Sequence, residues 1–252
     1  MRRLLALATF AVAIASSANA AAIVDGESDE TPSVVSIGPK DDPVCSGTVI
    51  GRRLVLTAAH CVNGDVQVNV DGETLSVAFA RVHPEFDETT MDHDIALLVL
   101  AEDAKVEAMP LATEVPSEGE RVRFVGFGRV KQNGESKGRR AGFVKIDSVE
   151  GKQFKTVPDP ATACGRDSGG AVLDESGTKL VGVISAGDAK CEKFAFATRL
   201  DVHQSFIGST LSGMESTGCS TGGTRSAGSP AFLVALVAMV SAAKRRFFHR
   251  AH

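Results

Sequence analysis

Short apolar or alternating segments, separated by turn residues, occupy residues 23–212 and constrain the fold more than any other feature. At residues 66–70 the sequence Val-Gln-Val-Asn-Val alternates apolar and polar side chains, as a half-buried strand does. Short strands at this spacing predict a β-sandwich or a β-barrel. Only the stretch from Arg199 to about Leu211 carries an apolar stripe at helical spacing. We therefore expect an all-β domain that ends in one helix.

The size and charge of the chain limit its class. Its 252 residues allow one substantial domain with a proper core, together with terminal segments. The formal net charge is −4, and no long basic run occurs in the middle of the chain. This argues against nucleic acid as a partner. We expect a monomer.

The N-terminal segment predicts export. Residues 1–22 begin with two arginines near the start, continue through an apolar run at residues 4–14 and end in small residues. This is the layout of a signal peptide that a signal peptidase removes. The alternative, an uncleaved membrane anchor, is disfavoured because the apolar run is too short to span a bilayer.

The C-terminal segment has a different composition again. Gly, Ser and Thr dominate residues 213–229, which predicts a flexible linker. Residues 230–252 contain an apolar run and then Lys244-Arg245-Arg246, which predicts a short transmembrane helix with a basic flank. Cys219 with small neighbours, the short helix and the basic end resemble bacterial C-terminal sorting tails of the MYXO-CTERM kind. That resemblance implies cleavage near Cys219 by a sorting protease and retention at the bacterial cell surface or outer membrane, or secretion after processing. An ordinary single-pass anchor is the alternative.

A candidate nucleophile lies at residues 164–170, which read Cys-Gly-Arg-Asp-Ser-Gly-Gly. Small neighbours around Ser168 would let a substrate carbonyl approach and let backbone N–H groups point at it. Glycine and serine also form ordinary turns, so this stretch alone does not decide between the two.

Two further segments supply possible partners for Ser168. His60 ends the sequence Thr-Ala-Ala-His after an apolar strand, and Asp94 stands at the start of the apolar strand Ile-Ala-Leu-Leu-Val-Leu. A carboxylate beside a buried strand is costly unless a group such as a histidine N–H pairs with it. The chain order His60, Asp94, Ser168 is one of the orders known for a base, acid and nucleophile triad.

With these motifs and an Ile-Val start at Ile23, the sequence resembles the chymotrypsin/trypsin family of serine peptidases over residues 23–212. The resemblance implies two packed six-stranded antiparallel β-barrels with a C-terminal helix. It also implies that Ser168 attacks the scissile peptide, that His60 transfers its proton and that Asp94 orients His60. Ser185 matches the family serine that hydrogen-bonds this aspartate.

The same resemblance assigns an oxyanion hole and an activation pair. The oxyanion donors are the N–H groups of Arg166 and Ser168. Arg166 stands where the family usually has glycine, and we therefore expect weakened or selective activity. The ammonium of a new N-terminus at Ile23 would pair with buried Asp167. The alanine-rich junction before Ile23 suggests that export itself generates this N-terminus.

The specificity pocket follows by position in the family. Thr162 aligns with its floor, and Gly187 and Ala195 align with its walls. No acid stands at the floor, so a small to medium apolar or neutral side chain is expected there, although Asp188 on the rim could favour basic residues.

Cysteine pairing also follows from the resemblance, which implies disulfides Cys45–Cys61 and Cys164–Cys191 and leaves Cys219 unpaired. The rival interpretation of four cysteines, a zinc site, lacks Cys-x-x-Cys spacing. We expect neither metal nor cofactor. His83, His93 and His203 are expected to be solvated or locally bonded side chains.

The predicted function is that of an exported, surface-retained serine endopeptidase that acts on protein or peptide substrates. The main alternative is a catalytically weak or silent homologue that binds proteins through the same cleft. An esterase-like hydrolase that uses the same triad is a third possibility.

Overall fold

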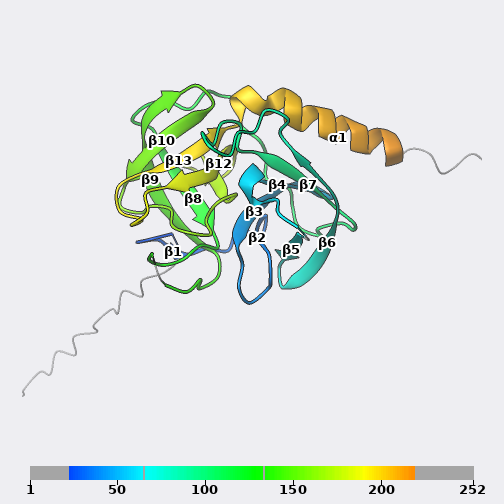
Figure 1. Cartoon of the computed structure of the whole chain (residues 1–252), viewed down its shortest axis with the longest axis horizontal. Coiled ribbons are helices and arrows are strands. Elements are labelled where there is room, and N and C mark those ends of the chain that lie inside the picture. The colour runs from blue at the N-terminus through cyan, green and yellow to red at the C-terminus, as the bar shows by residue number, and fades with distance from the viewer. Residues whose placement is uncertain (1–22, 65, 133, 219–252) are drawn as a thin grey trace, which may run out of the picture.

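The computed structural model describes residues 23–64, 66–132 and 134–218 (Figure 1). The predicted signal peptide, Cys219 and the predicted membrane segment lie outside these residues. Within the described part, no helix is long and apolar enough to cross a membrane.

The first half of the chain forms a closed antiparallel barrel in the order β2-β3-β4-β7-β6-β5. Its strands are β2 (Val34–Ile37), β3 (Cys45–Gly51), β4 (Leu54–Thr57), β5 (Gln67–Val70), β6 (Glu73–Val82) and β7 (Ala96–Leu100). The Leu-Val-Leu-Thr of β4 and most of β7 are buried, because both strands contribute side chains to the packed interior.

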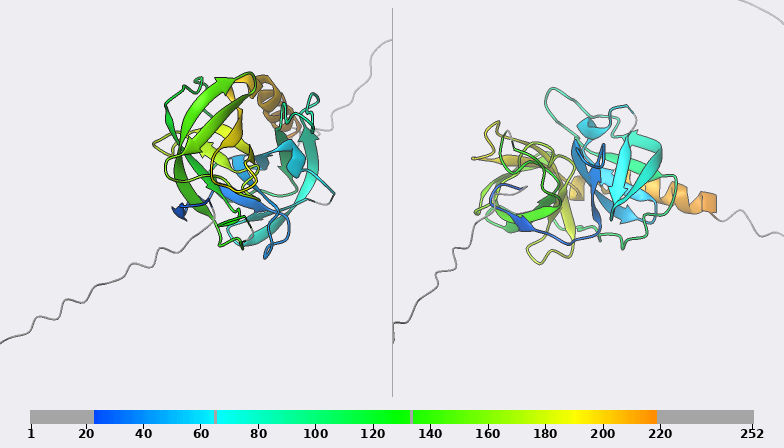
Figure 2. Two further views of the ribbon diagram at one scale, coloured as in Figure 1. Left: turned by 60° about the vertical axis from the view of Figure 1, so that its left-hand side comes forward. Right: turned by 90° about the horizontal axis from the view of Figure 1, so that it is seen from below.

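The second half forms another antiparallel sheet, in the order β9-β10-β13-β12-β11-β8, which closes through the pairing of β8 with β9. Its strands are β8 (Arg121–Gly126), β9 (Arg140–Glu150), β10 (Gln153–Pro158), β11 (Ala171–Leu173), β12 (Leu180–Gly187) and β13 (Ala195–Arg199), and the short β1 (Glu27–Ser28) pairs with β9. Figure 2 shows the two barrels side by side. The predicted pair of six-stranded antiparallel barrels is confirmed.

The C-terminal helix connects the barrels. After the 3-10 turn η2 (Asp201–His203), α1 (Gln204–Gly218) leaves the second barrel and packs on the first (Figure 1). Phe206 and Ile207 are buried in a core cluster that contains residues of both barrels. The predicted apolar stripe is therefore the docking face of the helix. The helix extends to Gly218, so residues 213–218, predicted as the start of a linker, are helical, and no proline interrupts them.

The serine-bearing turn of the second barrel presses against the first barrel. The amide of Ser46 in β3 donates to the carbonyl of Ser168 at 2.8 Å. Gly169 has φ +82°, and a Cβ there would lie 2.2 Å from both the Ser46 carbonyl oxygen and Thr57 Oγ1. Glycine is required at this position by both the left-handed backbone and the close approach.

Candidate active site

His60 is held by Asp94 at the edge of the first barrel. His60 lies on the 3-10 turn η1 (Ala59–Cys61) directly after β4, and its Nδ1 lies 2.8 Å from Asp94 Oδ2. The His60 backbone N–H donates to the other carboxylate oxygen at 3.1 Å. Because a carboxylate only accepts, Nδ1 carries the hydrogen and Nε2 is left with a lone pair for a proton.

Asp94 is buried, and both its carboxylate and its carbonyl group accept hydrogen bonds. Ser185 of β12, in the second barrel, donates its hydroxyl to Asp94 Oδ2 at 2.5 Å, and Thr198 Oγ1 donates to the Asp94 carbonyl at 2.9 Å. Burial by itself raises the pKa of Asp94, but the hydrogen bonds from His60 and Ser185 outweigh it and hold this pKa below its ordinary value. The sequence indicated Ser185 but gave no signal for Thr198, which is adjacent only in the fold.

The Ser168 hydroxyl points to a different partner. Its Oγ donates to the backbone carbonyl of Ser185 at 3.0 Å. Among the described residues, no hydrogen bond joins Ser168 Oγ to His60. Such catalytic bonds often form only when substrate is present.

Arg166 has an unusual backbone conformation. Its φ is +80°, a region that side chains with a Cβ rarely adopt. Its carbonyl accepts a bond from Ser46 Oγ at 3.1 Å, and its guanidinium pairs with Asp42 in the segment between β2 and β3. The Arg166 guanidinium holds the pKa of the Asp42 carboxyl below its ordinary value. Asp42 is a contact that sequence patterns did not indicate.

Two amide groups of this turn remain available. Among the described residues, neither the N–H of Arg166 nor that of Ser168 donates to a protein acceptor, whereas the N–H of Asp167 between them bonds to the Cys164 carbonyl. Unpaired N–H groups beside a nucleophile are what an oxyanion requires.

Asp167 is completely buried on the other side of the turn. Its carboxylate accepts the amides of Gly128 at 2.8 Å and Cys164 at 2.9 Å, and also the backbone N–H of Ile23. Burial raises the pKa of Asp167 to about 7, although these bonds act in the opposite direction. The nitrogen of Ile23 in this full-length chain is a peptide amide, so it supplies a hydrogen bond without a charge.

A cavity of about 220 Å³ opens beside Ser168. Its lining includes Ile184, Ala186 and Gly187, together with Cys164 and Cys191. Gly187 was predicted in this pocket. Of the other two predicted residues, Thr162 is buried and pairs with Val24, and Ala195 is buried within β13; neither is among the described residues that line this cavity.

The polar residues that line the cavity in the described part of the chain are Gln132, Ser168, Ser185 and Asp188, of which Asp188 is the one acid. The carboxylate of Asp188 accepts the amides of Lys190, Glu192, Lys193 and Phe194 in its own loop. Burial alone raises the pKa of Asp188, but these four bonds lower it below its ordinary value. Three of these bonds share Oδ1, and the bond from Lys190, at 3.2 Å, is to Oδ2.

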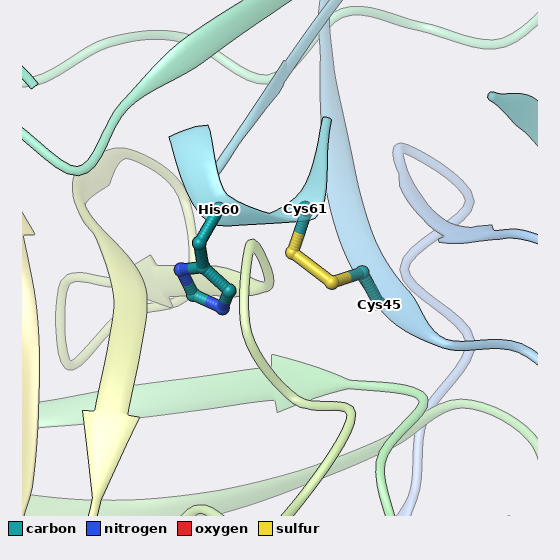
Figure 3. A group of neighbouring side chains, drawn as sticks. All are labelled: Cys45, His60 and Cys61. Carbon is teal, nitrogen blue, oxygen red and sulfur yellow. A yellow bond between two sulfur atoms is a disulfide. The ribbon is translucent and has the colours of Figure 1, made fainter. Parts of the chain in front are cut away.

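Both predicted disulfides are present, Cys45–Cys61 and Cys164–Cys191. Figure 3 shows the His60 ring beside the first of them. The Cys45, His60 and Cys61 atoms lie close enough to suggest a metal site, but both sulfurs are oxidised in the disulfide and offer no thiolate.

Two antiparallel barrels with a histidine–aspartate pair on one and a serine turn on the other define a class of serine peptidase. The chain belongs to the trypsin family, whose model matches residues 23–207. It is a serine-type endopeptidase, a hydrolase.

The chain is also similar to individual curated relatives and to a solved structure. The chain is 27% identical to trypsin iota of Drosophila melanogaster over 69% of this chain and 81% of that protein. It is 37% identical to chymase of Mus musculus, over 35% of this chain and 42% of that protein. The structure of neuropsin, a serine protease expressed in the limbic system of mouse brain, superposes with a TM-score of 0.68 at 24% identity. It covers 75% of this chain and all of neuropsin, and this likeness supports the fold.

Proposed function

We propose that the chain hydrolyses peptide bonds through His60, Asp94 and Ser168 with an acyl-enzyme intermediate. The observation that carries the proposal is the 2.8 Å contact between His60 Nδ1 and Asp94 Oδ2, which fixes the imidazole tautomer. Ser168 Oγ turns from the Ser185 carbonyl to His60 Nε2 and attacks the substrate carbonyl carbon while Nε2 accepts its proton. The resulting imidazolium then protonates the leaving amine, and water repeats the sequence to release the acid.

The developing oxyanion would be bound by the N–H groups of Arg166 and Ser168. Both lack a protein acceptor within the described part of the chain, which supports this assignment. Ser185 assists indirectly, since it donates to the same Asp94 oxygen that holds His60.

For specificity, we propose a small to medium apolar or neutral residue before the scissile bond. Ile184 and Ala186 contribute apolar surface to the cavity, and Asp188 accepts hydrogen bonds from its own loop. Peptides ending in Leu, Ala, Phe or Arg before the cleaved bond test this. Arg as the preferred residue would contradict it.

Activation is proposed to begin with release of Ile23 by export processing. The new ammonium would remain beside Asp167 and would turn its neutral hydrogen bond into an ion pair. N-terminal sequencing of the secreted form tests this, and a fully active mature chain that starts before Ile23 would contradict it. We also propose tail cleavage near Cys219 and retention at the cell surface, which C-terminal mapping of the mature chain tests.

A fluorophosphonate probe separates the candidate functions. We expect labelling at Ser168 in processed protein, with Ser168→Ala as the unlabelled control. The alternative, a weak or silent homologue that binds proteins, is favoured by the unusual backbone of Arg166, and absence of labelling would support it. An esterase would take up the probe and cleave esters but leave peptides intact.

A further inference from the structure

Three histidines from distant parts of the chain meet outside the active site. His83 follows β6, His93 lies in the loop before β7, and His203 ends η2. The His83 and His93 ring centroids are 4.4 Å apart, and that of His203 is 5.2 Å from each. We expected each of these histidines to be solvated or locally bonded, and His83 and His203 do make local bonds, to Glu85 and Arg199. The meeting of the three rings was not expected from the sequence, and it depends on the docking of α1, which brings His203 to the first barrel.

His203 is oriented as metal-binding histidines are. It is only 1% exposed, and its Nδ1 lies 2.6 Å from the carbonyl oxygen of Arg199. Since a carbonyl only accepts, Nδ1 carries the hydrogen and Nε2 directs a lone pair into the cluster. A backbone carbonyl that fixes the second ring nitrogen in this way is the usual outer support of a histidine ligand.

His93 completes the inner face of the cluster. Its Nδ1 lies 3.1 Å from His203 Nε2, and its Nε2 lies 3.6 Å from a carboxylate oxygen of Glu85. Without an ion, the two inner nitrogens share one hydrogen. An ion would replace that hydrogen, and His93 would then carry its hydrogen on Nε2, facing Glu85. The backbone of His93 is left-handed, with φ +51°.

His83 is the partly exposed and adjustable member. Its ring stacks on His93 at an interplanar angle of 13°, and its Nδ1 accepts the Glu85 amide at 3.2 Å. To direct a lone pair at a shared ion, the ring turns out of the stack and releases this long, exposed bond. One potential ligand atom of each histidine already lies within 4.8 Å of the other two.

We propose that His83, His93 and His203 bind a divalent transition-metal ion, with Zn²⁺ as the preferred ion. Three neutral imidazoles match Zn²⁺, whose fourth position water or the Glu85 carboxylate would complete. Mg²⁺ and Ca²⁺ are disfavoured because they require mainly oxygen ligands. Since His93 directly precedes Asp94, the ion would also fix the segment that carries Asp94. None of the three histidines belongs to the proposed catalytic triad, so the proposal does not rest on it.

Calorimetric titration of the full chain with ZnCl₂ tests the site. The reference protein carries Cys219→Ser, His249→Ala and His252→Ala, which remove other possible ligands in the tail. We expect one Zn²⁺ per chain, and we expect His83→Gln and His93→Asn each to weaken binding by more than about 100-fold, since loss of an outer support alone costs roughly 10- to 100-fold. Asparagine is chosen because it tolerates the left-handed backbone of His93.

His60→Ala is the matched control, because it removes a histidine of the other cluster and should retain binding. Co²⁺ should give tetrahedral visible absorption in the reference and not in the two variants, and thermal unfolding verifies that each variant folds. The proposal is overturned if the reference binds no Zn²⁺ at about 1 mM. It is also overturned if the two variants bind as the reference does, or if His60→Ala alone abolishes binding.

Discussion

At the scale of single residues, the turn that carries Ser168 combines two uncommon situations. Arg166 holds a left-handed backbone without being glycine, and Asp167 is a carboxyl group with no exposed surface. Each affects a different property. Arg166 bears on the oxyanion donors, and Asp167 bears on how the stability of the chain depends on pH.

Arg166→Gly tests whether the oxyanion N–H is already well placed. We expect kcat/KM for a small peptide substrate to stay within about tenfold, because the N–H is retained and is unpaired in the structure, while loss of one donor is worth roughly 10²- to 10³-fold. Asp42→Asn, which removes the ion pair and keeps the backbone, is the control. A rise of 100-fold in Arg166→Gly would mean that arginine turns this peptide away from the substrate.

Asp167 should make the uncleaved chain lose stability as pH rises from about 4 to about 7. The unfolded carboxyl releases its proton near pH 4, whereas the folded one keeps it until its pKa of about 7. The unfolded state therefore binds fewer protons in this window, and the free energy of unfolding falls by roughly 4 kcal/mol.

Denaturant unfolding of full-length Ser168→Ala at several pH values measures this effect. Adding Asp167→Asn should remove that part of the slope, since asparagine does not ionise. Equal slopes with and without Asp167→Asn would show that the carboxyl is not desolvated in the folded chain. A chain that begins at Ile23 should also show a smaller slope, because its ammonium pairs with the ionised form.

At the scale of elements, the serine turn is positioned by contact as well as by its own backbone. Gly169 fills the narrow space between this turn and the strands β3 and β4 of the first barrel. A second glycine, Gly72, has nearly the same φ of +83° but has no atom within 4 Å of a Cβ built there. Comparing an alanine substitution at each position therefore separates the cost of a left-handed backbone from the cost of steric conflict.

Gly169→Ala should therefore cost far more stability than Gly72→Ala. We expect about 1 kcal/mol for Gly72→Ala from the left-handed backbone alone. We expect at least about 3 kcal/mol for Gly169→Ala, because the added methyl meets backbone atoms that cannot yield. Chemical denaturation of both variants measures the difference, and similar losses would contradict the tight contact.

The elements also show what the sequence could and could not predict. Alternation at residues 66–70 and the apolar stripe of α1 identified strands and a helix, because periodicity records which face is buried. Motifs at His60, Asp94 and Ser168 identified groups that the fold does bring to one region. The pocket lining and the pairing of Arg166 with Asp42 depend on loop paths, and the histidine cluster depends on where α1 docks. Local sequence encodes neither the paths of the loops nor the place where α1 docks.

At the scale of the whole molecule, one of the two hydrophobic core clusters among the described residues spans both barrels. One hydrophobic cluster contains Val49 and Leu97 of the first barrel, Val125 and Leu180 of the second, and Phe206 of α1. Shared packing of this kind makes separate unfolding of either barrel costly. We therefore expect a single unfolding transition for the described domain.

Phe206→Ala should lower the free energy of unfolding by about 3–5 kcal/mol, because a large side chain leaves a well-packed cluster. The transition should remain single. Val202→Ala is the control, since Val202 is 38% exposed and its loss should change stability by no more than about 0.5 kcal/mol. Two resolved transitions in calorimetry of Phe206→Ala would show that the barrels fold separately.

The bond from Ser185 to Asp94 joins the two barrels at the proposed triad, because each residue belongs to a different half of the chain. A polypeptide emerging from synthesis or export carries His60 and Asp94 well before it carries Ser168 and Ser185. Neither half alone holds both a base and a nucleophile. Under the proposed mechanism, an incomplete or unfolded chain would not cleave neighbouring proteins. Proteolytic activity would arise only after both barrels have been synthesised and folded together.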